Sequence, residues 1–81
     1  MLEQIKSILK DALQLGPRAD TYTNETPLFG SIAEFDSMAV LTVLTLIEER
    51  FDIKIDDDEV TAELFATVGT LGAFVEEKIR A

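Results

Sequence analysis

Apolar residues recur every three or four positions at the start of the chain, which is the spacing of one face of an α-helix. Polar residues fill the opposite face. We therefore expect an amphipathic helix over about residues 2–15. Gly16-Pro17 should end it, because glycine suits the position after a helix and proline cannot continue one. The stripe consists of Leu2, Ile5, Leu9, Ala12 and Leu13, widened by Ile8.

Residues 16–36 show no clean period and contain turn-forming residues, among them Asn24, Pro27 and Gly30. We expect a long loop, with a short helical turn around residues 28–33. A loop of this length in a small domain needs anchors in the core. The expected anchors are Leu28, Phe29, Ile32 and Phe35.

The stretch from Met38 to Ile47 is apolar at eight of its ten positions. Such a short apolar run is compatible with either a strand or a helix. Asp36 is a good N-cap and Ser37 suits a first turn, which favours a helix over about residues 37–51. The residues expected to face the core, spaced three, three and four apart, are Leu41, Leu44, Ile47 and Phe51.

The remaining chain predicts an extended link and two further helices. Ile53 and Ile55 alternate with a lysine, and one of the aspartates at 56–58 should then cap a brief helix running through Glu59 and Val60 to Leu64. Thr67 is the expected cap of the last helix, in which Gly69 and Gly72 should each cost up to about 1 kcal/mol relative to alanine. The core face of this helix is expected to hold Val68, Leu71, Val75 and Ile79.

These elements predict an all-α fold, a small antiparallel four-helix bundle of three main helices and one short helix, with a long loop between the first two. The length of 81 residues corresponds to a single domain, 1–81. We expect a monomer.

The net charge of the chain narrows the range of expected binding partners. Seven basic and sixteen acidic residues give 7 − 16 = −9, which disfavours nucleic acid and anionic membranes and favours basic surfaces on other proteins. The longest apolar run is too short to span a bilayer, and the helical, partly acidic N-terminus does not resemble a signal peptide. We therefore expect a cytoplasmic protein without membrane insertion.

Missing residue types argue against an enzyme. The chain has no histidine and no cysteine, which removes the commonest zinc ligands, thiol nucleophiles and serine–histidine pairs. The acidic run at 56–59 lacks the glycine and the closing glutamate of a calcium loop, and it better fits a helix start, which favours negative charge.

Ser37 has two interpretations. A serine beside an aspartate before an apolar helix is ordinary capping, the favoured reading on physical grounds alone. A phosphate ester on Ser37 would, however, lie at a helix N-terminus, where the amide groups and the macrodipole favour negative charge. An apolar group attached through the same phosphate ester would lie at the edge of the core.

The chain resembles an acyl carrier protein over nearly its whole length. Asp36-Ser37-Met38 is similar to the family's Asp-Ser-Leu, residues 48–51 resemble the end of its second helix, residues 53–56 the link into its third, and Thr67-Val68-Gly69 the start of its last. The resemblance implies that Ser37 carries 4′-phosphopantetheine, added from coenzyme A by a phosphopantetheinyl transferase. The arm's thiol would hold acyl groups as thioesters, and acyl ligases, transferases or synthases with basic surfaces would be the partners.

The chain departs from the family pattern near the serine. Glu34-Phe35 replaces the usual glycine two residues before the aspartate, and residues 38–42 lack the acids that many fatty-acid carriers have there. The nearest acids on this helix are Glu48 and Glu49, which we take with Val40 as partner-docking candidates. These departures favour a carrier from a specialised bacterial pathway over one from general fatty-acid biosynthesis.

Two alternatives remain at this point. The chain could be an aminoacyl or peptidyl carrier, or a helical protein–protein interaction module without a prosthetic group. In the second case Met38 and Val40 would form an exposed partner-binding patch.

Overall fold

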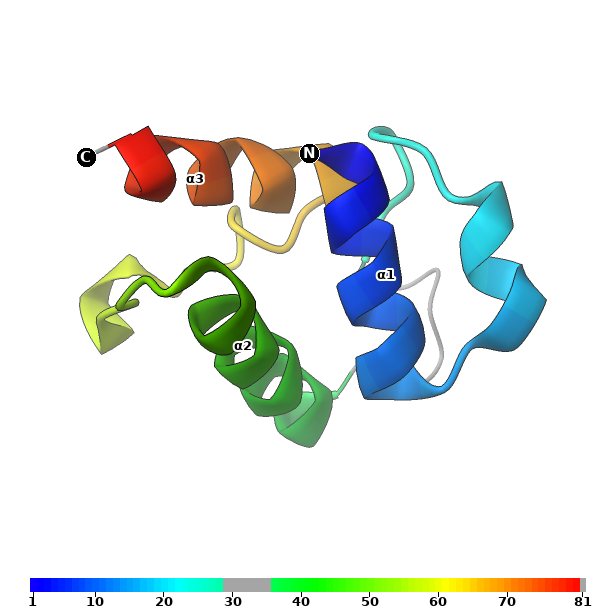
Figure 1. The fold of residues 1–81 in the computed structure, drawn as a ribbon, viewed down its shortest axis with the longest axis horizontal. Helices are drawn as coiled ribbons and strands as arrows, with labels where there is room; N and C mark the ends of the chain where they lie inside the picture. Colours follow the sequence, from blue (N-terminus) through cyan, green and yellow to red (C-terminus); the bar gives the residue numbers. More distant parts are fainter. Residues whose placement is uncertain (29–35, 81) are drawn as a thin grey trace.

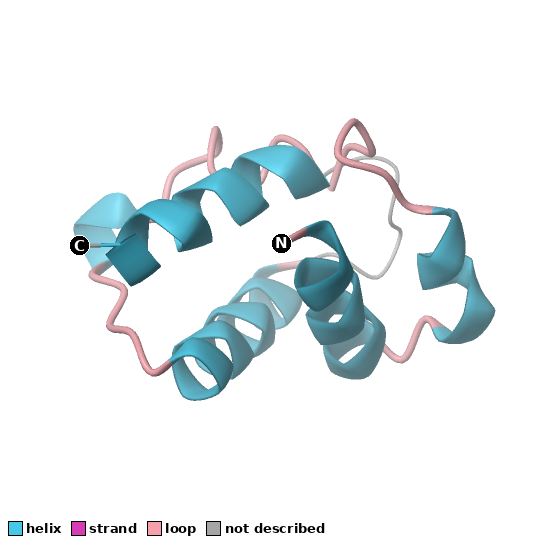
Figure 2. Cartoon of the chain, turned by 45° about the horizontal axis from the view of Figure 1, so that its top comes forward, coloured by secondary structure: helices cyan, strands magenta, loops and turns pink. Residues whose placement is uncertain are grey.

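The computed structural model describes residues 1–28 and 36–80. Three α-helices, α1 (Leu2–Leu13), α2 (Ser37–Phe51) and α3 (Val68–Arg80), are accompanied by two short 3₁₀ helices, η1 (Gly16–Thr21) and η2 (Asp57–Glu59). Helix α1 packs against both α2 and α3 (Figure 1). The described residues contain no strand (Figure 2), so the predicted all-α bundle with short helical segments is confirmed.

Helix α1 agrees with the predicted amphipathic helix, with Ile5, Ile8 and Leu9 fully buried. It ends at Leu13, slightly earlier than expected, because Gln14 adopts the left-handed conformation that closes the helix. Gly16 and Pro17 then begin η1, which the sequence pattern did not predict. Pro17 is compatible with the first turn of a helix because its missing N–H is not needed there.

Helix α2 has the predicted bounds, and its predicted core face is wrong only at Leu41: Ile47 is buried, and Leu44 and Phe51 are half-buried against the core. The buried residues are Ala39, Val43 and Ile47, which form one row at spacings of four. Leu41, predicted to face the core, is 60% exposed. The run is apolar on every side, so its periodicity did not exclude Leu41 from the buried face.

The link after α2 is extended as predicted, and the brief helix capped by Asp56 is present but ends before Leu64. The 3₁₀ helix η2 ends at Glu59, and the chain at Val60 is extended. The Leu64 N–H donates to Thr61 Oγ1 at 3.2 Å, so Leu64 belongs to a separate turn. Its side chain and that of Phe65 are buried in the core.

Helix α3 begins as predicted, because Thr67 Oγ1 accepts a hydrogen bond from the Thr70 N–H at 3.1 Å. Val68, Leu71 and Val75 are buried as expected. Ile79 does not reach the core and is 47% exposed.

The segment before residue 28 is joined to the start of α3 by backbone hydrogen bonds. The Val68 N–H donates to Thr26 O at 2.9 Å, and the Gly69 N–H donates to Asn24 O at 2.8 Å. Leu28 is fully buried, which confirms it as an anchor. The other expected anchors, Phe29, Ile32 and Phe35, lie outside the described residues, as does most of the expected helical turn at 28–33.

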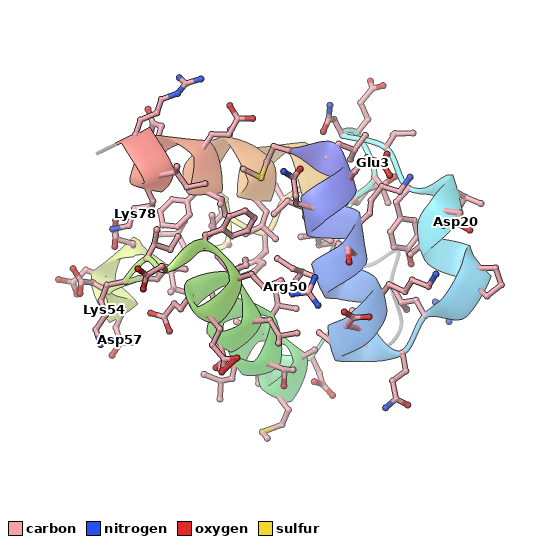
Figure 3. All side chains as sticks on the ribbon, in the orientation of Figure 1. Glu3, Asp20, Arg50, Lys54, Asp57 and Lys78 are labelled. Atoms are coloured by element: carbon pink, nitrogen blue, oxygen red, sulfur yellow. The ribbon has the colours of Figure 1, made fainter. Side chains whose placement is uncertain are left out.

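Arg50 joins the end of α2 to α1. Its guanidinium donates to Ser7 Oγ at 3.1 Å and pairs with the Asp11 carboxylate, and its side chain extends from α2 toward α1 (Figure 3). This contact links the C-terminal end of α2 to α1 at the surface of the molecule. Within the described residues, no helix has the length and apolar character needed to cross a bilayer.

Candidate functional site at the start of helix α2

Asp36 and Ser37 have different tasks at the start of α2. Asp36 has an extended backbone and is the N-cap: its Oδ1 accepts from the Ala39 N–H at 2.9 Å and its carbonyl oxygen accepts from the Val40 N–H at 3.0 Å. Ser37 is the first residue of the helix and its side chain is exposed. The cap therefore does not use the Ser37 hydroxyl, which faces solvent at the positive end of the helix dipole.

Met38 and Val40, expected to be exposed together, have different environments. Met38 is 70% exposed, whereas Val40 is half-buried and packs against the core. The sequence analysis missed Leu41 as its exposed neighbour, because it assigned Leu41 to the core.

We call Met38, Leu41, Thr42 and Thr45 the apolar face of α2. Thr42 Oγ1 donates to Met38 O at 3.0 Å and Thr45 Oγ1 donates to Leu41 O at 2.9 Å. Because both hydroxyls are bonded back to their own helix, this face presents mainly carbon and carries no charge. It begins at the residue next to Ser37.

Glu48 and Glu49 lie near the other end of α2, roughly 16 Å from Ser37 along the helix axis at 1.5 Å per residue. Glu48 is half-buried, and its Oε2 accepts from the Ile55 N–H at 2.8 Å. Glu49 is exposed. The structure thus separates the predicted acidic pair into one residue that holds the link after α2 and one that faces solvent.

The start of α2 fits a covalently attached phosphate group. An exposed hydroxyl provides the attachment atom, and the N-terminal amides and dipole of a 15-residue helix favour the negative charge of a phosphodiester. Ala39 and Val43, on the next turns of α2, face the core. An arm starting here therefore has both solvent and the edge of the apolar interior within reach.

Three comparisons with known proteins agree. The family model for the phosphopantetheine attachment site matches residues 3–75. An acyl carrier protein of Streptococcus pyogenes serotype M3 is 37% identical over 78 residues, covering 96% of this chain and 95% of the relative. That of Sulfurovum sp. is 32% identical over 76 residues, covering 94% and 95%. The solution NMR structure of a holo acyl carrier protein from Nitrosomonas europaea superposes with a TM-score of 0.93 at 49% identity, covering 99% and 96%.

A helical bundle matched over residues 3–75 by the family model for the phosphopantetheine attachment site defines a carrier with this prosthetic group. The chain belongs to the acyl carrier protein family. Members of this family are carriers, not catalysts: they receive the prosthetic group from a phosphopantetheinyl transferase and present acyl groups to partner enzymes. The family resemblance seen in the sequence is thereby confirmed.

Proposed function

We propose that Ser37 carries the 4′-phosphopantetheine arm, on whose terminal thiol acyl groups are held as thioesters. The observation that carries this proposal is the exposed Ser37 side chain at the start of α2, next to a cap made by Asp36 alone. The transferase would join Oγ to the arm's phosphate as a phosphodiester, with loss of the hydroxyl proton and of the nucleotide part of coenzyme A.

The other serines provide weaker alternatives. Ser7 lies on α1, where its Oγ accepts a hydrogen bond from Arg50 at 3.1 Å, so its modification would disrupt the contact between α1 and α2. Ser31 lies outside the described residues. Of the two described serines, Ser37 is thus the one whose surroundings favour an added phosphate.

The test is the intact mass of the chain after incubation with coenzyme A and a phosphopantetheinyl transferase. We expect wild type and Ser7→Ala to gain one phosphopantetheine and Ser37→Ala to gain none. Ser37→Ala should keep its fold by circular dichroism, because Asp36 still caps α2. A mass increase on folded Ser37→Ala, or an adduct mapped to Ser31, would overturn the assignment.

We further propose that the carrier works in a specialised bacterial pathway, with dedicated partner enzymes. The support is the apolar face of α2: an enzyme that acts on the Ser37 arm approaches beside Met38 and Leu41, which carry no charge and are largely exposed. A partner that matches this face must itself present apolar side chains. We also propose that the protein is cytoplasmic and monomeric, and that residues 1–81 form a single carrier domain.

A further inference from the structure

The outer surface of α3 is hollowed into a groove on the side that adjoins residues 59–66. Its volume is about 770 Å³. Leu64, Ala66, Ala73 and Phe74 form its apolar part. Two of these residues are alanines with exposed side chains, and their small size leaves the space that larger residues would fill.

The polar part of the groove is strongly acidic. Four glutamates line it against one base, Arg80. Glu59 is paired with Lys78 at 2.9 Å, and Glu76 lies 3.5 Å from Arg80. Among the described residues, no ion pair engages the carboxylates of Glu63 and Glu77, and both side chains are exposed.

The groove is separate from the start of α2. In Figure 1, α3 runs along the top of the molecule, and the first turn of α2 lies at the bottom. Charge differs between the two places as well, because the first acid within α2 is Glu48, after eleven uncharged residues from Ser37 to Ile47. A basic partner surface is therefore attracted to α3 more than to the first turns of α2.

We propose that this groove, lined by Glu63, Glu77 and the apolar residues named above, docks a basic segment of a partner enzyme, one in which a lysine or arginine neighbours a bulky apolar side chain. The cation would pair with the exposed carboxylates of the groove, and the apolar side chain would cover Ala66 and Ala73. This inference rests on the proposed function, since it assigns a second contact to enzymes that act on the arm. A partner enzyme would then contact the apolar face of α2 where it acts on the arm, and the groove would attract the enzyme electrostatically over a longer range.

The experiment titrates the isotope-labelled full chain, without its arm, with a short acetylated and amidated peptide in which two arginines flank a leucine. We expect amide signals of residues 63–66 and 70–77 to shift. The double variant Glu63→Lys/Glu77→Lys should weaken binding by about tenfold or more, the effect of losing roughly 1.4 kcal/mol. Exchanging the leucine of the peptide for serine should weaken binding as well, because the apolar contact is lost.

The matched control is Asp20→Lys/Glu25→Lys. Both double variants change the net charge equally, −9 + 4 = −5, but Asp20 lies at the opposite side of the molecule from Lys78, which lies beside the groove (Figure 3). The control should change affinity by less than about threefold. Equal weakening in both variants, no weakening in either, or shifts centred on α2 would overturn the proposal. Because the titration does not need the arm, its failure would leave the Ser37 assignment intact, and a failure of Ser37 modification would leave the groove to be judged by the titration alone.

Discussion

Gly69 occupies a position at which a side chain would collide with backbone. Its N–H donates to Asn24 O, and a Cβ at this position would lie 2.7 Å from that same oxygen. On helix propensity alone, Gly69 and Gly72 should lower the stability of α3 equally. The structure separates them, because a Cβ on Gly72 would meet no backbone and would lie 3.3 Å from Cγ of the flexible Met1 side chain.

We predict that Gly69→Ala lowers the free energy of unfolding by about 1–3 kcal/mol, the usual cost of overpacking. Gly72→Ala is the matched control within the same helix, and we expect it to range from a small loss to a gain of up to about 1 kcal/mol from helix propensity. Urea denaturation of both variants is the measurement. Equal effects of the two substitutions would show that the contact with Asn24 does not constrain position 69.

At the scale of elements, Glu59 connects η2 to α3. Its Oε1 accepts from the Asp56 N–H at 3.0 Å and from Lys78 Nζ at 2.9 Å. Two contacts hold the pKa of Glu59 below its ordinary value: the hydrogen bond from the Asp56 backbone, which has the larger effect, and the contact with Lys78. A carboxyl whose pKa is lower in the folded state stabilises the fold above its unfolded-state pKa, and this contribution is lost as the pH falls through the folded-state value.

The prediction compares wild type, Glu59→Gln and the control Glu25→Gln in urea denaturation between neutral and acid pH. At neutral pH, Glu59→Gln should be less stable than wild type. The difference should shrink as the pH falls through the lowered pKa of Glu59, because wild type loses the same interaction. The Glu25→Gln curve should follow wild type. A gap between wild type and Glu59→Gln that persists in acid would mean that the carboxylate charge is not what stabilises this contact.

The two acids near the end of α2 have different expected roles. Glu48→Lys should lower the free energy of unfolding by about 1–3 kcal/mol, because the half-buried Ile55 N–H loses its acceptor. Glu49→Lys should leave stability nearly unchanged, since exposed charges contribute little, and should slow loading by a partner with a basic surface. Glu48, named from the sequence as a docking candidate, is thus expected to affect stability as well.

Unfolding midpoints and phosphopantetheine loading rates at low and moderate salt measure these effects. If Glu49→Lys loads as fast as wild type at both salt concentrations, Glu49 has no part in docking. If Glu48→Lys is as stable as wild type, the hydrogen bond to Ile55 contributes nothing measurable.

Local signals allowed the helices to be predicted, and contacts over long sequence distances limited the prediction. The Asp36 and Thr67 caps fix the starts of α2 and α3 within a few residues of chain, so the sequence alone identifies them. The edge of the buried face of α2 depends on where α1 and the core lie, and the apolar sequence did not show that Leu41 falls outside that face. The early end of η2 likewise accompanies a contact between Glu59 and Lys78, which are 19 residues apart.

At the scale of the whole molecule, the distribution of charge predicts that enzymes of general fatty-acid synthesis act slowly on this carrier. The apolar face of α2 offers no acid to a basic synthase surface beside the arm, which should lower the association rate rather than abolish binding. The residues suited to adding charge are Leu41 and Thr42, because both are exposed. Ala39, another early uncharged position, is 6% exposed and unsuitable.

The measurement compares malonyl transfer and condensation on the wild-type carrier, on a generic fatty-acid carrier and on Leu41→Glu/Thr42→Glu. We expect wild type to be slower than the generic carrier and the double variant to recover part of the difference. Equal rates for wild type and the generic carrier would refute the specialised pathway. A double variant that folds but gains nothing would show that absent charge is not the cause.

The part of the candidate site that consists of adjacent residues could be predicted from the sequence. The part that is assembled from distant segments of the chain could not. Asp36 and Ser37 are adjacent, so their pattern can be recognised in the chain. The groove on α3 is lined by residues of two separate segments, among them Glu63 and Glu77, and by two small alanines. A sequence pattern identifies acids and small residues but does not show that they enclose a common volume.

The backbone pairing between residues 24–26 and the start of α3 also explains how a modifying enzyme could distinguish two similar hydroxyls. Thr67 and Ser37 each begin a helix with a hydroxyl side chain. The Thr67 oxygen is occupied by the Thr70 N–H, and the amides of Val68 and Gly69 donate to backbone carbonyls. Because the Thr67 side chain is half-buried and already accepts a hydrogen bond, and because the neighbouring amides are engaged, this helix start is less suited to an added phosphate than the start of α2.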